Sequence, residues 1–179
     1  MSHKPLDIRF NPTKEKLLIG VISDTHIVRT SGVPAKVKEI FRDVDLIIHA
    51  GDIVSLEAIE DLEKIAPVRA VYGNMDPPSV RKRLTSTLCI EIFEWRIGVR
   101  HDTLPLWAGW KMHRLAKENK LDVLIFGHTH RPFLKRQDNV LLINPGSPTN
   151  PLQGKPSVAL LHLDKDYYEG EIVEIEKVR

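Results

Sequence analysis

The chain has 179 residues, of which 42% are hydrophobic and 28% are charged. These proportions are typical of a soluble globular protein, and the length suits one domain that buries its core without disulfides. The chain carries 26 basic and 24 acidic side chains. The resulting formal charge of +2 is too small to indicate nucleic acid as the main partner.

The single cysteine, Cys89, cannot form an internal disulfide, which fits a reducing compartment. Residues 1–5 lack the apolar core of a secretion signal, and no apolar run approaches membrane-spanning length. We therefore expect a cytoplasmic protein with no membrane partner.

Residues 1–16 contain two prolines and several charges without periodicity, so we expect a terminal arm or a short edge segment there. A single domain is expected to follow over residues 17–179. Its first part alternates apolar runs with helical patterns. Strands are predicted at 16–23, 45–50 and 68–72. This β-α-β-α-β order predicts parallel strands with right-handed crossovers.

Two helices are predicted between these strands. Pro34 opens the first, whose apolar stripe recurs at helical spacing through Val37, Ile40, Phe41 and Val44. Ser55 is the expected N-cap of the second, which ends before Pro67.

The second half is richer in strands, with predicted hairpins of 87–93 with 96–100, 133–137 with 140–144, and 157–163 with 167–177. A helix at 106–119 and a strand at 122–126 interrupt them. We predict an α/β fold of two sheets packed face to face with helices outside. Nine apolar residues should lie in strands, many of them facing the space between the sheets: Leu88, Ile90, Ile92, Val99, Val140, Leu142, Val158, Leu160 and Ile172.

Five apolar runs end in residues that can bind a metal. The clearest run is followed by Gly127-His128-Thr129-His130, in which alternate residues of an extended segment can present two imidazoles to one point. The other runs precede Asp24 with His26, Asp52, Asn74 and His101. Ligands of open α/β sheets collect at the carboxyl ends of strands, so this edge is the predicted active site.

The predicted ligand set comprises two carboxylates, one amide and four imidazoles, too many for one tetrahedral zinc. It suits two divalent cations that share Asp52, an arrangement that holds both oxygens of a phosphoryl displacement. Two carboxylates against four positive charges leave the site at about +2, which attracts an anionic substrate. A water between two such cations loses a proton near neutral pH and becomes a nucleophile.

These motifs resemble those of the calcineurin-like metallophosphoesterases, over residues 17 to about 164. The likeness is greatest to the small single-domain bacterial and archaeal phosphodiesterases, a group that includes the retromer subunit as a non-bacterial relative. The motifs that carry it are Ser23 to His26, Gly51-Asp52, Gly73 to Asp76, His101, Gly127 to His130, Asn144 to Thr149, and Pro156 to Ala159.

The resemblance implies a four-layer α/β/β/α sandwich, two mixed sheets flanked by helices. It also implies two divalent ions, manganese first, with nickel, iron or zinc as alternatives. Carried over by motif, Asp24, His26 and His130 would hold one ion. Asn74, His101 and His128 would hold the other, and Asp52 would bridge. Asn74, His101 and Asp52 are also the residues assigned to catalysis.

Two positions depart from the family pattern. Met75 stands where the full motif has a histidine that acts as general acid, and Asp102 follows His101 where a glycine is usual. Asp102 is either a loop acid or a hydrogen-bond partner of a neighbouring imidazole. Trp107 and Trp110 are either core or interface anchors or substrate platforms, and their region is a candidate surface of a homo-oligomer.

The leading functional hypothesis is a phosphodiesterase in which a hydroxide bridging two divalent metals hydrolyses a phosphate-ester substrate. Two alternatives stay open. One is a non-catalytic scaffold of the same fold that binds a partner protein; the other is a phosphomonoesterase or nucleotide pyrophosphatase with the same site.

Overall fold

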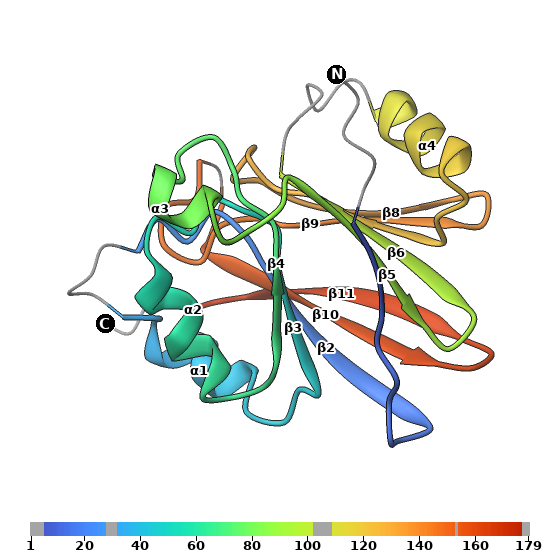
Figure 1. Ribbon diagram of the computed structural model, residues 1–179, viewed down its shortest axis with the longest axis horizontal. Helices are drawn as coiled ribbons and strands as arrows, with labels where there is room; N and C mark the ends of the chain where they lie inside the picture. Colours follow the sequence, from blue (N-terminus) through green and yellow to red (C-terminus); the bar gives the residue numbers. More distant parts are fainter. Residues whose placement is uncertain (1–5, 28–31, 102–108, 153, 177–179) are drawn as a thin grey trace.

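The computed structural model describes residues 6–27, 32–101, 109–152 and 154–176. Its strands form two mixed sheets that pack face to face, and helices cover both outer faces (Figure 1). The six-stranded sheet has the order β1-β5-β6-β7-β9-β8, and the five-stranded sheet has the order β11-β10-β2-β3-β4. The predicted four-layer α/β/β/α architecture is confirmed.

The five-stranded sheet contains the predicted parallel unit. Its strands are β2 (Lys16–Ile22), β3 (Leu46–His49), β4 (Val68–Ala70), β10 (Ser157–Asp164) and β11 (Tyr168–Glu174). Strands β2, β3 and β4 run parallel, joined by α1 (Ala35–Ile40) and α2 (Leu56–Glu63). Ser55 caps α2 as predicted, since its hydroxyl accepts a hydrogen bond from the N–H of Ala58 at 3.4 Å.

The six-stranded sheet is built from β1 (Leu6–Arg9), β5 (Thr87–Ile92), β6 (Trp95–Arg100), β7 (Val123–Ile125), β8 (Pro132–Gln137) and β9 (Val140–Pro145). Its two predicted hairpins, β5 with β6 and β8 with β9, are present. Strand β1 lies parallel to β5 at the sheet edge. The last helix, α4 (Gly109–Glu118), covers this sheet, and the predicted start of that helix at 106–108 lies outside the described residues.

A short helix, α3 (Pro78–Arg81), follows β4 and was not predicted. It is a single turn that begins directly after Pro77. Four residues are too few for an apolar stripe to recur, so the pattern that revealed the longer helices is missing here.

The core has three parts: between the sheets, under α1 and α2, and under α4. All nine strand residues named above lie in strands, and Leu88, Ile90, Ile92 and Val99 face the space between the sheets. Ile172 also packs there, whereas Val140 and Leu142 pack toward α4, and Val158 and Leu160 toward α1 and α2. Both faces of these sheets are covered by apolar layers, so residue type alone could not identify the inward face.

No helix in the described part of the chain is long and apolar enough to cross a membrane. Trp110 on α4 is 56% exposed, whereas Trp107 lies outside the described residues. Self-association through this region stays a prediction.

Replacing Phe41 should test the packing of α1 on the five-stranded sheet. Phe41 is fully buried, and a Cβ added to Gly20 of β2 would lie 3.0 Å from its ring. We expect Phe41→Ala to lower the free energy of unfolding by about 3–5 kcal/mol, measured by urea titration, because it removes a large side chain from a closed space. The matched control, Tyr167→Ala at an exposed position, should change it by no more than about 0.5 kcal/mol. Equal effects would contradict this packing.

Candidate metal centre

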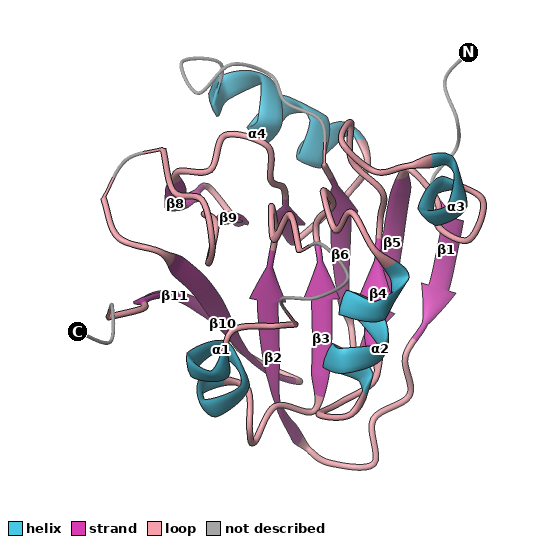
Figure 2. Ribbon diagram, turned by 90° about the vertical axis from the view of Figure 1, so that its left-hand side faces the viewer, coloured by secondary structure: helices cyan, strands magenta, loops and turns pink. Residues whose placement is uncertain are grey.

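The carboxyl ends of β2 and β3 lie side by side in the five-stranded sheet (Figure 2). Strands β6 and β7 are parallel neighbours in the other sheet, so their carboxyl ends also lie side by side. The loops that leave these ends and the end of β4 carry all seven predicted ligands, and all seven lie among the described residues. Six of them form two groups in which the ligand atoms lie within 4.8 Å of one another. One group is Asp24, His26 and His130; the other is Asp52, His101 and His128.

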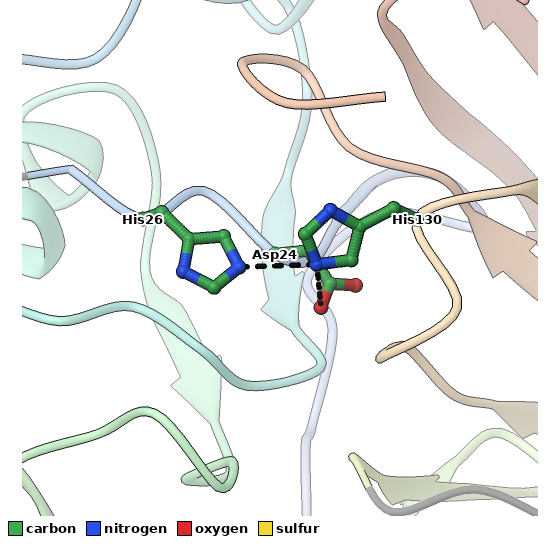
Figure 3. A group of neighbouring side chains, drawn as sticks. All are labelled: Asp24, His26 and His130. Atoms are coloured by element: carbon green, nitrogen blue, oxygen red, sulfur yellow. Dashed lines mark hydrogen bonds and ion pairs between the residues drawn. The ribbon is translucent and has the colours of Figure 1, made fainter. Parts of the chain in front are cut away.

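The first group points two imidazoles and a carboxylate at one another (Figure 3). The Nε2 atoms of His26 and His130 are 3.1 Å apart, and His130 Nε2 is 3.3 Å from Asp24 Oδ1. The Nδ1–H of His130 donates to the carbonyl of Asn150 at 2.6 Å, which leaves the lone pair of Nε2 directed at the group.

The second group includes the amide of Asn74. Asn74 Oδ1 lies 3.0 Å from His101 Nε2 and 2.6 Å from His128 Nδ1. The Nδ1–H of His101 donates to the carbonyl of Ala50 at 2.8 Å, so this ring is oriented in the same way as His130.

Asp52 lies between the two groups. Its Oδ2 is 3.3 Å from His101 Nε2 and 3.8 Å from His26 Nε2, which belong to different groups. Its other oxygen, Oδ1, accepts the backbone N–H of Met75 at 2.7 Å. One carboxylate oxygen therefore faces both groups.

The backbone at this edge is strained. Five of the seven predicted ligands adopt the left-handed region, with φ between 45° and 70°: Asp24, His26, Asp52, His128 and His130. Such strain in non-glycine residues is concentrated at functional sites, where the surroundings hold it in place. Gly127 lets its loop pack closely against Ser23 and Asp24, because a Cβ there would lie 1.9 Å from Ser23 Oγ and 2.9 Å from Asp24 Oδ2.

Hydrogen bonds from neighbouring loops fix Asp24. The hydroxyl of Ser23 donates to Asp24 Oδ2 at 2.6 Å, and the backbone N–H of His128 donates to both oxygens at 2.8 and 3.1 Å. The hydroxyls of Ser147 and Thr149 donate to the carbonyls of Asp24 and Thr25. These supporting roles could not be predicted from residue type, since hydroxyls are common in loops.

The electrostatics of the site follow from burial and from these contacts. Burial raises the pKa of Asp24 above its ordinary value, against the hydrogen bond from Ser23 and the charge of nearby imidazoles. Burial also acts to raise the pKa of Asp52, but His101 and the N–H of Met75 outweigh it and lower that pKa. The pKa of His101 is raised by Asp52 although burial opposes this. The two opposite shifts share one cause, the contact of 3.3 Å between His101 Nε2 and Asp52 Oδ2.

The donor atoms fit divalent metals. Ligands bound about 2.0–2.2 Å from one ion lie roughly 3–4 Å from each other, which is the spacing found within each group. A mixture of imidazole nitrogens and oxygens suits manganese, iron, nickel and zinc, and two adjacent groups give two positions.

Comparison with known proteins shows the family of the chain. The family model described as the calcineurin-like phosphoesterase superfamily domain matches residues 17–166. A probable metallophosphoesterase from Methanothermobacter thermautotrophicus is 44% identical over 159 residues, which cover 88% of this chain and 92% of that protein.

Solved structures show the same fold. An archaeal phosphodiesterase superposes with a TM-score of 0.70 at 30% identity, covering 88% of this chain and 100% of that one. Vps29 from Entamoeba histolytica complexed with Zn²⁺ superposes with a TM-score of 0.73 at 24% identity, covering 88% of this chain and 99% of that one. The second likeness shows the fold alone.

His49, at the end of β3, is a fully buried histidine behind the site. Its Nδ1 accepts the N–H of Gly51 at 3.2 Å, which leaves Nε2–H to donate to Thr25 Oγ1 at 3.1 Å. Burial and the nearby charge of His101 lower the pKa of His49 from 6.5 to about 3. His49 is therefore neutral in the folded protein at every pH above that value.

This lowered pKa predicts acid sensitivity. Between pH 6.5 and about 3 the unfolded chain binds a proton at His49 that the folded chain excludes, so stability falls as the pH falls. The contribution is up to about 1.4 kcal/mol per pH unit in this window and vanishes above it. His49→Gln should lose less stability than wild type on acidification, measured by urea unfolding of chelator-treated protein. His162→Gln, at an exposed position, is the control. Parallel curves for wild type and His49→Gln would refute the assignment.

Proposed function

Because the chain belongs to the calcineurin-like phosphoesterase superfamily, we propose that it is a metal-dependent phosphodiesterase that hydrolyses phosphate diesters. The observation that carries the proposal is the position of Asp52 Oδ2, which faces His101 at 3.3 Å and His26 at 3.8 Å. A shared carboxylate oxygen is what a two-metal phosphoryl-transfer site requires.

Each group would hold one ion. Asp24, His26 and His130 would bind the first, Asn74, His101 and His128 the second, and Asp52 both. When bound, two such cations supply a water acidic enough to act as nucleophile near neutral pH and offset the charge of the phosphoryl oxygens. Manganese is our first choice of metal, with nickel, iron and zinc as alternatives.

The protein's own contribution is orientation. The carbonyls of Ala50 and Asn150 fix the tautomers of His101 and His130, so their Nε2 atoms face the site without further rearrangement. His128 and Asn74, the two exposed ligands of the predicted set, line the open side, where a phosphate ester can approach. The positive balance of the loaded site attracts this anion.

Protonation of the leaving group is the step for which this chain lacks the family's usual residue. Met75 is 59% exposed and its thioether cannot donate a proton. Asp76 does not replace it, because both of its oxygens accept backbone N–H groups and the residue is buried. Asp102 lies outside the described residues.

The same site would also serve a phosphomonoesterase or a nucleotide pyrophosphatase, which differ in substrate alone. Hydrolysis of bis(p-nitrophenyl) phosphate by the manganese-loaded protein, compared with p-nitrophenyl phosphate, separates the diesterase from the monoesterase. A fully loaded chain that cleaves neither would favour the scaffold alternative.

We place the enzyme in the cytoplasm because its one cysteine, Cys89, is buried and free.

Replacing Asp52 tests the shared ligand. Asp52→Asn removes one negative charge from the position between the two groups, so we expect loss of activity and of stoichiometric binding of two metals. Metal analysis after equilibrium dialysis is the measurement, and two tightly bound ions per chain in the variant would refute the sharing.

Met75 predicts a strong dependence of the rate on the leaving group. General acid help is worth about 10²–10⁴-fold and matters most for basic leaving groups. Aryl diesters should therefore be cleaved readily and alkyl diesters slowly, with a steep plot of log kcat/KM against leaving-group pKa. Met75→His should flatten this plot, helping poor leaving groups more than good ones. A wild-type rate that hardly changes with leaving-group pKa, with chemistry rate-limiting, would mean that another residue supplies the proton.

A further inference from the structure

Asp76 makes an unusual set of contacts beside the second group. It is 3% exposed, and its carboxylate accepts four backbone N–H groups. Oδ1 accepts those of Ile53 at 2.8 Å and Val54 at 2.6 Å. Oδ2 accepts those of Asp52 at 3.1 Å and Gly73 at 2.7 Å. A single side chain thus connects the loop after β3 with the loop after β4.

These contacts hold a strained backbone. Asp52 and Val54 have φ values of 55° and 75°, which L-residues rarely adopt, and a β-branched residue adopts least readily. Charge-assisted hydrogen bonds to a carboxylate are about twice as strong as neutral ones, so Asp76 can stabilise this conformation. Without it, the N–H groups of three successive residues would lose their common acceptor.

The strained loop determines which oxygen of Asp52 faces the site. Met75, adjacent to Asp76, donates its N–H to Asp52 Oδ1 at 2.7 Å, and this leaves Oδ2 toward His26 and His101. Arg81, on α3, donates to the carbonyls of Asn74 and Asp76, both at 2.7 Å. These bonds hold the turn of residues 73–76 in place. Among the described residues, the hydrogen bonds of the Asp76 carboxylate go to backbone N–H groups and not to the imidazoles of the site.

We infer that Asp76 is a positioning residue for the metal pair: it sets the loop so that Asp52 presents one oxygen to both ions. The inference rests on the proposed function, because it requires two metals. Asp76 acts through Asp52 and Asn74. Its loss should therefore weaken the second group more than the first, whose Asp24 and His130 are held by hydrogen bonds to Ser23, the N–H of His128 and the carbonyl of Asn150.

The test uses the full chain and Mn²⁺ as the probe. Loss of an orienting residue behind metal ligands typically costs 10–100-fold in affinity. In Asp76→Asn we expect one Mn²⁺ to bind about 10–100-fold more weakly in calorimetric titration, and the other with little change. The electron paramagnetic resonance spectrum of wild type should show two exchange-coupled Mn²⁺ ions, because one oxygen links them. In the variant it should revert to that of isolated ions.

Asp45→Asn is the matched control. Asp45 lies just before β3, at the opposite end of the strand from Asp52, and its carboxylate also accepts a backbone N–H, from Leu18 at 2.9 Å. Its loss should lower stability while leaving both affinities and the coupled spectrum unchanged. If Asp76→Asn behaves like Asp45→Asn, the inference is overturned. If wild type itself binds no coupled pair, the proposed function fails instead.

Asp76→Glu keeps the test decisive if the amide variant does not fold. It retains the charge and both acceptor oxygens but displaces them by one methylene. We expect this variant to fold, to bind two Mn²⁺ ions, and to show a weaker second affinity and reduced exchange coupling. Unchanged values for both would show that the position of this carboxylate does not matter and would overturn the inference.

Discussion

The burial of two carboxylates, Asp24 and Asp52, is the constraint on which this edge of the molecule depends. An ionised carboxylate removed from water is costly unless charge and hydrogen bonds compensate it. Here the compensation comes from backbone and side-chain donors on one side and from four imidazoles on the other. The second set is the one that metals would engage. The loops therefore adopt a strained backbone that neither hydrophobic packing nor local propensity would select.

The two groups are supported by different parts of the chain. The loop of residues 144–150 holds the first, since Ser147, Thr149 and Asn150 contact residues 24, 25 and 130. The turn of residues 73–76 holds the second, with Asp76 and Arg81 as its fixed points. Asp52 faces both groups through one oxygen, and the loop of residues 127–130 supplies His130 to the first group and His128 to the second.

Much of the fold could be predicted from the sequence because the determining signals were local. Apolar runs, the cap at Ser55 and the hairpin spacing gave nearly all strands and helices in the correct order. The turn at Pro78–Arg81 was missed because it is too short for periodicity. The inward faces of β9 and β10 could not be assigned either, since both sides of each sheet contact apolar layers and a one-residue shift exchanges them.

The candidate site could also be predicted only in part. The seven predicted ligands could be named from their positions after apolar runs and from the family resemblance, and the structure brings them together. The role of Asp76 could not be predicted, because in the sequence an acid in a turn looks the same whether it faces solvent or accepts four N–H groups. The sequence also could not predict which oxygen of Asp52 faces the site, since this depends on backbone angles that residue identity does not specify.

The predicted ligands are spread from residue 24 to residue 130 and follow strands of both sheets. In addition, the first strand of the chain pairs with a segment some eighty residues later, as Leu6 lies opposite Leu88. Such distant pairings make folding slow relative to helical proteins of this size. They also mean that no short fragment of the chain contains all seven predicted ligands. Metal affinity is thus a property of the finished tertiary structure, and by mass action each bound ion would draw the population toward the fully assembled chain and away from partly folded forms.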